Sequence, residues 1–424
     1  MLAFCTLLLI SSCAKSPKKI TNTNDYNKYL ELAENKTLQT AIDENEFWKA
    51  KLEAHPEQFS YLVKIAASYS HLFAITGDIS YLKAAETHYL KANTTTNYKK
   101  SDVLRALAAN YMTQHKFKEA LMIATKAELI GDGLQSTQKM IFDIQLELGN
   151  YHLAKAYLEK FENMSDFDYL IRLAKWNDHQ GNLTAAIKYL EKAKAIAESS
   201  NVISNKLWIY TNLADFYGHE GNIKASYNYY LKALKLDPYS AYAKKGIAWI
   251  VYSYEKNPDE ALRILNSVST TNKTPSYNLI KAQIADFKGD KKLKDTELKL
   301  YETEVKNPDY GNMYNKYNIL LLTEKKQNLG DAISIGKIEV KNRPTPESYD
   351  LLAWAYYNNG NLQDALKIIN NYIANKTYHP ESLYHCAKIY KAAGNFDKVN
   401  QIKKELASNL YELGPILAQK IDNL

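Results

Sequence analysis

Apolar residues recur with a helical period along most of the chain. In the segment 207–220, Leu213, Ala214 and Tyr217 fall on one apolar face of a helix. The segment 224–236, KASYNYYLKALKL, continues with the same period. This pattern predicts two consecutive amphipathic helices joined by a short turn.

Glycine and proline set the boundaries of these two helices. Gly221 supplies the left-handed conformation that ends a helix without a Cβ clash. Pro238 ends the second helix, because proline disfavours the helical conformation at the residue before it. Ala214, Ser226 and Ala233 are small residues on the inward faces, so the backbones of two crossing helices can approach closely. We therefore expect the two helices to pack antiparallel.

The same phrase recurs along the chain. It reads GNYHLAKAYLEKF from Gly149, GNLTAAIKYLEKA from Gly181, GNIKASYNYYLKA from Gly221 and GNLQDALKIINNY from Gly360. Aligned on the glycines, the units have a period near 34 residues, which is typical of a stacked array. One helix pair cannot bury its apolar face alone, so repetition builds a continuous core.

The spacing resembles the tetratricopeptide repeat (TPR) family. In the unit described above, the matching residues are Leu213, Ala214, Tyr217, Gly221, Tyr230, Ala233 and Pro238, with Ser226 where alanine is usual. Other units keep Leu107, Ala108, Tyr111, Phe117, Ala120 and Ala127; Leu173, Ala174, Gly181, Ala186 and Ala193; Leu352, Ala353, Tyr356, Gly360, Leu362 and Ala365; and Cys386, Ala387, Tyr390, Gly394 and Phe396. The segments 275–306 and 310–342 keep the helical period but lose most of the signature.

The resemblance implies an all-α, right-handed superhelix of about ten helix pairs with a concave groove. We expect the array to cover 57–410, a helical N-terminal cap to cover 25–56, and a capping segment to cover 411–424. Residues 1–12 are predicted to form a signal peptide, and residues 13–24 a lipidated cysteine with a flexible tether.

The N-terminal prediction depends on a short apolar run, Leu2 to Ile10. This run is too short to span a bilayer but long enough for a signal-peptide core. Ser11 and Ser12 followed by Cys13 resemble the lipobox of bacterial lipoproteins, which implies acylation of Cys13. Two differences from the family are the lack of Lys or Arg before the run and Ile10 in place of the commoner leucine. The alternative is an ordinary secretory signal.

Such an anchor implies a TPR lipoprotein of a bacterial cell envelope, similar to those of Bacteroidota, on the outer membrane and facing the periplasm. Several acyl chains would hold it stably on the membrane. Only Cys386 would remain as a thiol in the mature chain, at a core position of a predicted helix.

The charge distribution and the absence of catalytic motifs argue against several classes of function. The net charge is +7, but lysines alternate with acidic residues and form no basic stripe, so we expect no nucleic-acid partner. The sequence has no phosphate-binding glycine loop, no His-Glu-x-x-His and no Cys-x-x-Cys motif. His379 and His385 flank Cys386 without a metal-ligand spacing. We therefore predict a non-catalytic protein without a cofactor or metal.

The concave groove is the remaining candidate site, because the first helix of each TPR pair lines it. The family's groove-facing positions correspond here to Arg105, Lys139, Asp143, Lys175, Trp208, Asp215, Tyr254, Trp354 and Tyr357. Tryptophan and tyrosine dominate protein-binding hot spots. The leading hypothesis is a membrane-anchored scaffold that binds a segment of a partner protein. The alternatives are a glycan- or nutrient-binding lipoprotein and an enzyme domain concealed in 275–342.

Overall fold

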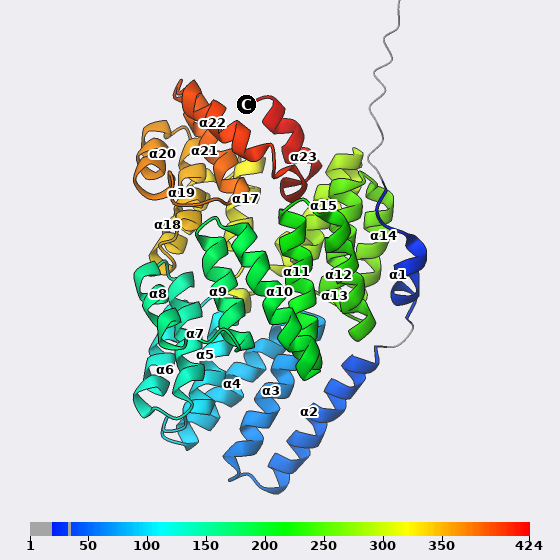
Figure 1. Ribbon diagram of the computed structural model, residues 1–424, viewed down its shortest axis with the longest axis vertical. Helices are drawn as coiled ribbons and strands as arrows, with labels where there is room; N and C mark the ends of the chain where they lie inside the picture. The colour runs from blue at the N-terminus through cyan, green and yellow to red at the C-terminus, as the bar shows by residue number, and fades with distance from the viewer. Residues whose placement is uncertain (1–18, 33–34) are drawn as a thin grey trace, which may run out of the picture.

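The computed structural model describes residues 19–32 and 35–424, and within these residues every regular element is helical. Ten consecutive antiparallel pairs form the array (Figure 1). The first helices of the pairs are α3 (Phe59–Thr76), α5 (Ser101–Thr113), α7 (Leu134–Glu147), α9 (Phe167–His179), α11 (Ile203–His219), α13 (Ala241–Trp249), α15 (Ser276–Lys288), α17 (Asn315–Lys325), α19 (Pro346–Asn358) and α21 (Pro380–Ala392). The second helices are α4 (Ile79–Thr95), α6 (Phe117–Ile130), α8 (Tyr151–Lys160), α10 (Leu183–Ser200), α12 (Ile223–Leu236), α14 (Pro258–Ser269), α16 (Lys291–Glu304), α18 (Leu329–Asn342), α20 (Leu362–Ile368) and α22 (Phe396–Leu406).

Six further elements extend or connect these pairs. They are α1 (Thr23–Leu30), α2 (Lys36–Ala54), α23 (Leu410–Asp422), a π-helical turn η1 (Ile250–Tyr254) after α13, a 3₁₀ turn η2 (Pro308–Tyr310) and a π-helical turn η3 (Ile369–Ile373) after α20. The predicted all-α helix-pair solenoid is confirmed. The segments with a weak signature form two ordinary pairs, α15–α16 and α17–α18, in the place where a concealed enzyme domain was the alternative.

The recurring Gly-Asn phrase has a structural explanation in two pairs. Gly181 and Gly221 have φ angles of 75° and 83°, which end the first helix. The next residue, Asn182 or Asn222, accepts a hydrogen bond from the backbone N–H three residues later, at 3.1 Å and 3.2 Å. The asparagine therefore caps the second helix. One dipeptide ends one helix and begins the next.

The core lies between the helices of each pair and between neighbouring pairs. Ala186, Ala214 and Ala233 are fully buried where helices cross. Large side chains fill the space around them, and a Cβ on Gly246 of α13 would lie only 2.1 Å from the ring of Tyr230. The alternation of small and large residues in the sequence is therefore the packing pattern of the core.

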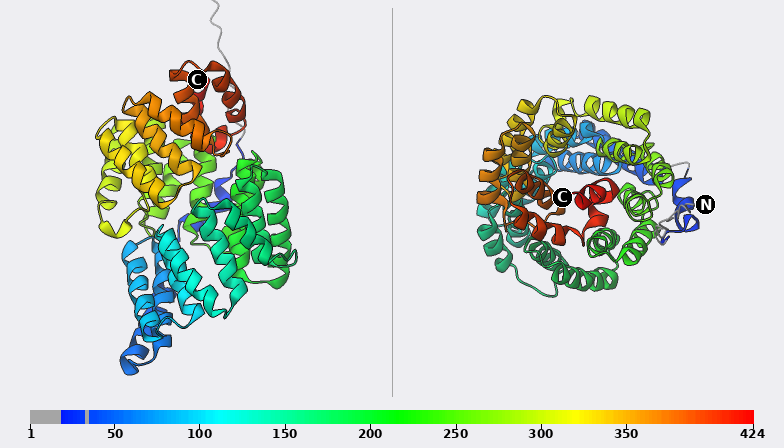
Figure 2. Two further views of the ribbon diagram at one scale, coloured as in Figure 1. Left: turned by 90° about the vertical axis from the view of Figure 1, so that its left-hand side faces the viewer. Right: turned by 90° about the horizontal axis from the view of Figure 1, so that it is seen from above.

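The second half of the array stacks on the first half. Seen from above the helices form a ring, and the side view shows two tiers (Figure 2). The backbone N–H of Lys273 donates to the carbonyl of Thr76 at 2.6 Å. A Cβ on Gly149 would lie 2.9 Å from the carbonyl oxygen of Pro344, and one on Gly181 would lie 2.6 Å from the Tyr378 ring. The turns within pairs of the first half thus pack on the connections between pairs of the second half.

Both ends of the described chain return to the middle of the array. Helix α2 packs against α3, whereas α1 packs against α12 and α14 (Figure 1). The Tyr26 hydroxyl donates to Glu260 at 2.7 Å, and the backbone N–H of Thr21 donates to Glu255 at 2.6 Å. Residues 19–22, at the end of the segment expected to be a tether, are therefore held against the array. At the other end, α23 packs against η1 and α11.

Candidate functional site

The second helices α6, α8 and α20 lie on the outer edge of the array, and the first helices α5 and α7 lie on the inner side of α6 and α8 (Figure 1). Side-chain bonds connect consecutive first helices along this inner face. Arg105 of α5 donates to the Asp132 carbonyl at 2.8 Å and to Thr137 of α7 at 3.1 Å. The predicted groove residue Arg105 thus connects two neighbouring pairs.

Lys139 of α7 is buried in an ion-pair cluster. Its ammonium lies 2.8 Å from the carboxylate of Asp166 and 3.3 Å from that of Asp168, and its side chain is only 9% exposed. Burial acts to raise the pKa of Asp166, but the bonds from Lys139 and from backbone N–H groups outweigh it, so this pKa lies below its ordinary value. Lys139 therefore binds its own chain.

Asp143 and Lys175 belong to the adjoining part of this cluster. Asp143 lies 2.8 Å from Arg172 and 3.6 Å from Lys175, and Lys175 lies 3.8 Å from Glu147. The structure therefore brings three predicted groove residues, Lys139, Asp143 and Lys175, into one charged network on α7 and α9. Of these, Lys175 is the most exposed, at 44% of its side chain.

The inner face of α11 and α13 has a different character. Trp208 is 39% exposed and Tyr242 is 47% exposed, which is unusual for such large rings. Asp215 lies on the same helix as Trp208 and accepts hydrogen bonds from the hydroxyls of Tyr230 and Tyr242, the latter at 2.5 Å. The ammonium of Lys245 lies 4.6 Å from the centre of the Tyr242 ring. We call Trp208, Asp215, Tyr242 and Lys245 the aromatic patch.

The aromatic patch is charged as well as apolar. Burial lowers the pKa of Lys245, and the nearby Asp215 carboxylate opposes that shift. Phe167 of α9 meets the Trp208 ring edge to face, with centroids 6.1 Å apart. The patch therefore offers two accessible rings beside a paired carboxylate and an amine.

The predicted residues of the second half lie elsewhere. Trp354 of α19 stacks on the His385 ring at 4.1 Å, and Tyr357 stacks on Trp354 at 5.3 Å. His385 is bonded through Nδ1 to Asp350 at 2.9 Å, and both residues are buried. Tyr254, at the end of η1, is half-buried against the largest core cluster. Trp354 and Tyr357 thus form a pair of their own, and Tyr254 is a packing residue.

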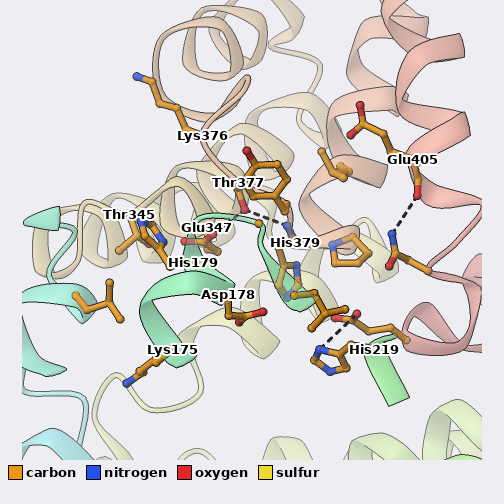
Figure 3. A pocket seen from close by; sticks show the side chains of 18 of the residues that line it. Lys175, Asp178, His179, His219, Thr345, Glu347, Lys376, Thr377, His379 and Glu405 are labelled. Atoms are coloured by element: carbon orange, nitrogen blue, oxygen red, sulfur yellow. Dashed lines mark hydrogen bonds and ion pairs between the residues drawn. The ribbon is translucent and has the colours of Figure 1, made fainter. Parts of the chain in front are cut away.

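A cavity of about 700 Å³ lies where the two tiers meet (Figure 3). Its lower wall includes Lys175, Asp178 and His179 from the end of α9, and its upper wall includes Glu347 and His379 from the second half. Burial raises the pKa of Asp178 and lowers that of His179. We call this space the intertier pocket.

Sequence reasoning missed both Tyr242 and the intertier pocket. Tyr242 lies one repeat after Trp208 on the next first helix, so the repeat register contained a signal for it. The pocket contained no such signal, because its walls come together only when the tiers stack. For example, the side-chain amide of Asn272 donates a hydrogen bond to the carbonyl of Ile75, which is 197 residues earlier in the chain. The repeat period does not predict such contacts, because it does not say how many repeats make one turn of the superhelix.

Several other predictions concern absent or undescribed features. Among residues 19–32 and 35–424, no group of three or more His, Cys, Asp or Glu side chains could hold a metal ion. None of the helices in that part of the chain is long and apolar enough to cross a membrane. Cys386 is buried, and burial raises the pKa of its thiol. Cys13 and the predicted signal peptide lie outside the described residues.

Comparisons with known proteins find one family model and solved structures that are similar to this chain. A family model described as tetratricopeptide repeat matches residues 209–240, which lie in α11, α12 and the connection from α12 to α13. Among solved structures, Pseudomonas aeruginosa pilF is similar with 14% identity and a TM-score of 0.37, over 50% of this chain and 94% of its own. Yeast Tom70 is similar with 14% identity and a TM-score of 0.38, over 94% of both chains. No curated protein matches the chain.

Proposed function

We propose that this chain, a tetratricopeptide-repeat protein, is a non-catalytic scaffold that binds a segment of a partner protein on its inner face and holds it at a membrane. The binding surface would be the aromatic patch on α11 and α13. The charged network of α7 and α9 would form the polar edge of this surface. Such a surface accepts an extended or helical segment through several modest contacts.

The observation that supports this proposal is the exposure of Trp208 and Tyr242. Each of these residues keeps more than a third of its surface accessible. Exposed aromatic rings that their neighbours hold in place provide contact area with little loss of conformational entropy, which is typical of binding hot spots. Asp215 fixes the Tyr242 hydroxyl. The patch is therefore preorganised for a partner.

Membrane anchoring through Cys13 is supported by the lipobox-like sequence. The first described residues also fit it, because Thr21 is bonded to Glu255 only eight positions after Cys13. An extended chain spans at most about 3.5 Å per residue, so an anchor at Cys13 would keep the array within roughly 30 Å of the membrane surface. Labelling with a fatty-acid analogue should modify the protein, and the Cys13→Ala variant should lose both the label and sedimentation with membranes.

The partner is tested by affinity purification after brief cross-linking in the native envelope. The double variant Trp208→Ala with Tyr242→Ala should lose a small recurrent set of partner proteins. The control is Tyr372→Ala, which removes a ring of similar exposure, 42%, from η3 after a second helix. A partner set that is unchanged in the double variant would contradict the proposed surface.

Glycan binding is the second candidate, and the same exposed rings favour it, because aromatic faces stack on sugar rings. The scaffold and the glycan-binding protein differ in the ligand that the aromatic patch would bind. Retention on a polysaccharide affinity gel that disappears in the Trp208→Ala, Tyr242→Ala variant would favour a glycan. Capture of a protein set with no retention on the gel would favour the scaffold.

A further inference from the structure

The C-terminal helix α23 lies against the inner face beside the aromatic patch. Viewed from above, it lies inside the ring of helices (Figure 2). It packs against α11 and η1, which precede it by more than 150 residues, as well as against α21 and α22, its neighbours in sequence. A regular repeat would place it mainly on α21 and α22, so its position on α11 and η1 needs its own explanation.

Two different faces of α23 make these two sets of contacts. Leu413 and Ile421 join Tyr384 and Leu406 in a small core cluster with α21 and α22. The other face carries Tyr411, whose carbonyl accepts a hydrogen bond from Ser253 of η1 at 2.5 Å. We call the surface of α11 and η1 under this second face the inner seat.

The inner seat is shaped for a tyrosine ring. Gly218 of α11 lies under Tyr411, and a Cβ at Gly218 would lie 2.9 Å from the ring. Burial raises the pKa of Tyr411, and the charge of Asp215 raises it further. Asp215 belongs to the aromatic patch and lies three residues before Gly218 on α11, so the patch and the seat adjoin on that helix.

Apolar packing holds α23 in the seat, and the polar contacts between them are few. Besides the Ser253 bond, Glu412 lies 4.0 Å from His219, and Gly414 lies against the Trp249 ring. Gly414 has φ 75° and ψ 167°, a conformation that is costly for other residues, and it bends the helix. Glu412 also forms part of the wall of the intertier pocket. Movement of α23 would therefore open the seat and the pocket together.

We propose that α23 is a displaceable occupant of the inner seat, and that the partner is a helical segment of the same kind. This partner segment would place a tyrosine over Gly218, bend as the chain does at Gly414, and continue as a helix with apolar residues spaced like Leu417 and Ile421 on α21 and α22. The inference rests on the proposed function, because it takes the inner face as the binding surface. It adds the chemistry of the partner and the chain's own competitor for the site.

The first experiment needs no partner. Amide hydrogen exchange of the full chain should show α23 exchanging at least about tenfold faster than α21 or α11, because a displaceable helix opens without global unfolding. Gly218→Ala should accelerate exchange in α23 further by pushing on Tyr411. The matched control is Gly330→Ala in α18, where an added Cβ has no neighbour within 4 Å. Protection of α23 equal to that of α21 would overturn the proposal.

The second experiment uses a labelled synthetic peptide with the sequence of residues 409–424. The acceptor is the full chain with Tyr411→Ala and Leu413→Ala, which weakens its own helix and leaves the seat intact. We expect this acceptor to bind the peptide at least about tenfold more tightly than the unaltered chain, a difference of ~1.4 kcal/mol. Tyr411→Ala in the peptide, or Gly218→Ala in the acceptor, should abolish the gain. Equal binding to both chains, or to neither, would contradict the inference.

These experiments separate the inference from the proposed function. A mobile α23 and a binding peptide, combined with an empty partner purification, would count against the scaffold alone. Partners lost in the Trp208, Tyr242 variant, combined with a fully protected α23, would count against the displaceable helix alone.

Discussion

Glycines at the same position of the repeat have different surroundings. Gly149 and Gly221 both end a first helix with positive φ, at 73° and 83°. Beside Gly149 lies the backbone carbonyl of Pro344, whereas an added Cβ at Gly221 has no neighbour within 4 Å. At position 149 both the positive φ angle and the nearby Pro344 backbone require glycine. At position 221 only the positive φ angle requires it.

Alanine substitution should separate these two requirements. Gly221→Ala is expected to lower the free energy of unfolding by about 1 kcal/mol, the cost of positive φ for a residue with a Cβ. Gly149→Ala should lower it by roughly 2 to 3 kcal/mol, because the Pro344 backbone must also move. Chemical denaturation of both variants measures the difference. Equal losses would mean that the contact between tiers contributes little at this turn.

Histidines at the meeting of the tiers should make stability depend on pH. Burial lowers the pKa of His179 below its ordinary value of 6.5, although the charge of Glu347 opposes the shift. Below about pH 6.5 the unfolded chain therefore takes up a proton that the folded chain resists. The stabilising contribution is complete above that pH and is lost as the pH falls. Asp178, whose pKa is raised, acts in the opposite direction nearer its ordinary value of 3.8.

The His179→Gln variant tests this dependence because it keeps a polar side chain that does not titrate. Its melting temperature should fall less than that of the unaltered chain between about pH 7.5 and about pH 5.5. Thermal unfolding at several pH values provides the measurement. If the melting temperature depended on pH in the same way in both proteins, His179 would not cause the pH dependence.

At the scale of helices, the inner face separates into a charged part and an aromatic part. Lys139 and Lys175 were predicted from sequence as equivalent ligands, yet the first is 9% exposed with two carboxylate partners and the second is 44% exposed. A buried ion pair that loses one partner leaves an uncompensated charge, whereas an exposed pair contributes little. The two lysines should therefore differ in their effect on stability.

Lys139→Ala is expected to lower the free energy of unfolding by about 3 kcal/mol. Lys175→Ala, its matched control on the next first helix, should change it by less than about 0.5 kcal/mol. Denaturant unfolding of both variants gives the comparison. If both substitutions were neutral, Lys139 would be free for a partner, as the sequence alone had indicated.

The helices themselves were largely predictable, because local patterns specify them. The segments predicted at 207–220 and 224–236 correspond to α11 and α12, since Gly221 and Pro238 limit helices through backbone conformation alone. The predicted groove residues were less predictable. The repeat spacing predicts which face of the helix these residues occupy. It does not predict that Lys139 and Asp143 form ion pairs with Asp168 and Arg172 of α9. Burial and pairing depend on tertiary contacts, whereas helix face depends on spacing.

At the scale of the whole molecule, stacking of the tiers changes an open solenoid into a compact ring. An open TPR array presents its inner face along its full length, whereas here the second half of the array stacks on the first (Figure 2). Arg343 lies at this junction. Its guanidinium lies 3.4 Å from Glu147 in the lower tier, 3.6 Å from Glu339 in the upper tier, and 5.3 Å from the centre of the Phe117 ring. Arg343 thus joins the two tiers through side-chain contacts.

Arg343→Ala should loosen the junction without unfolding the helix pairs, because each pair keeps its own core. We expect faster amide exchange in the turn at 147–150 and the connection at 343–346, with little change in α11 or α12. The radius of gyration measured by small-angle X-ray scattering should increase as the tiers separate. Lys325→Ala is the control, since its ion pair with Glu302 at 2.6 Å lies wholly within the upper tier. If the scattering and the exchange at both segments match those of the control, the tiers are held by backbone contacts such as Lys273 with Thr76, and the ring is a fixed feature of the fold.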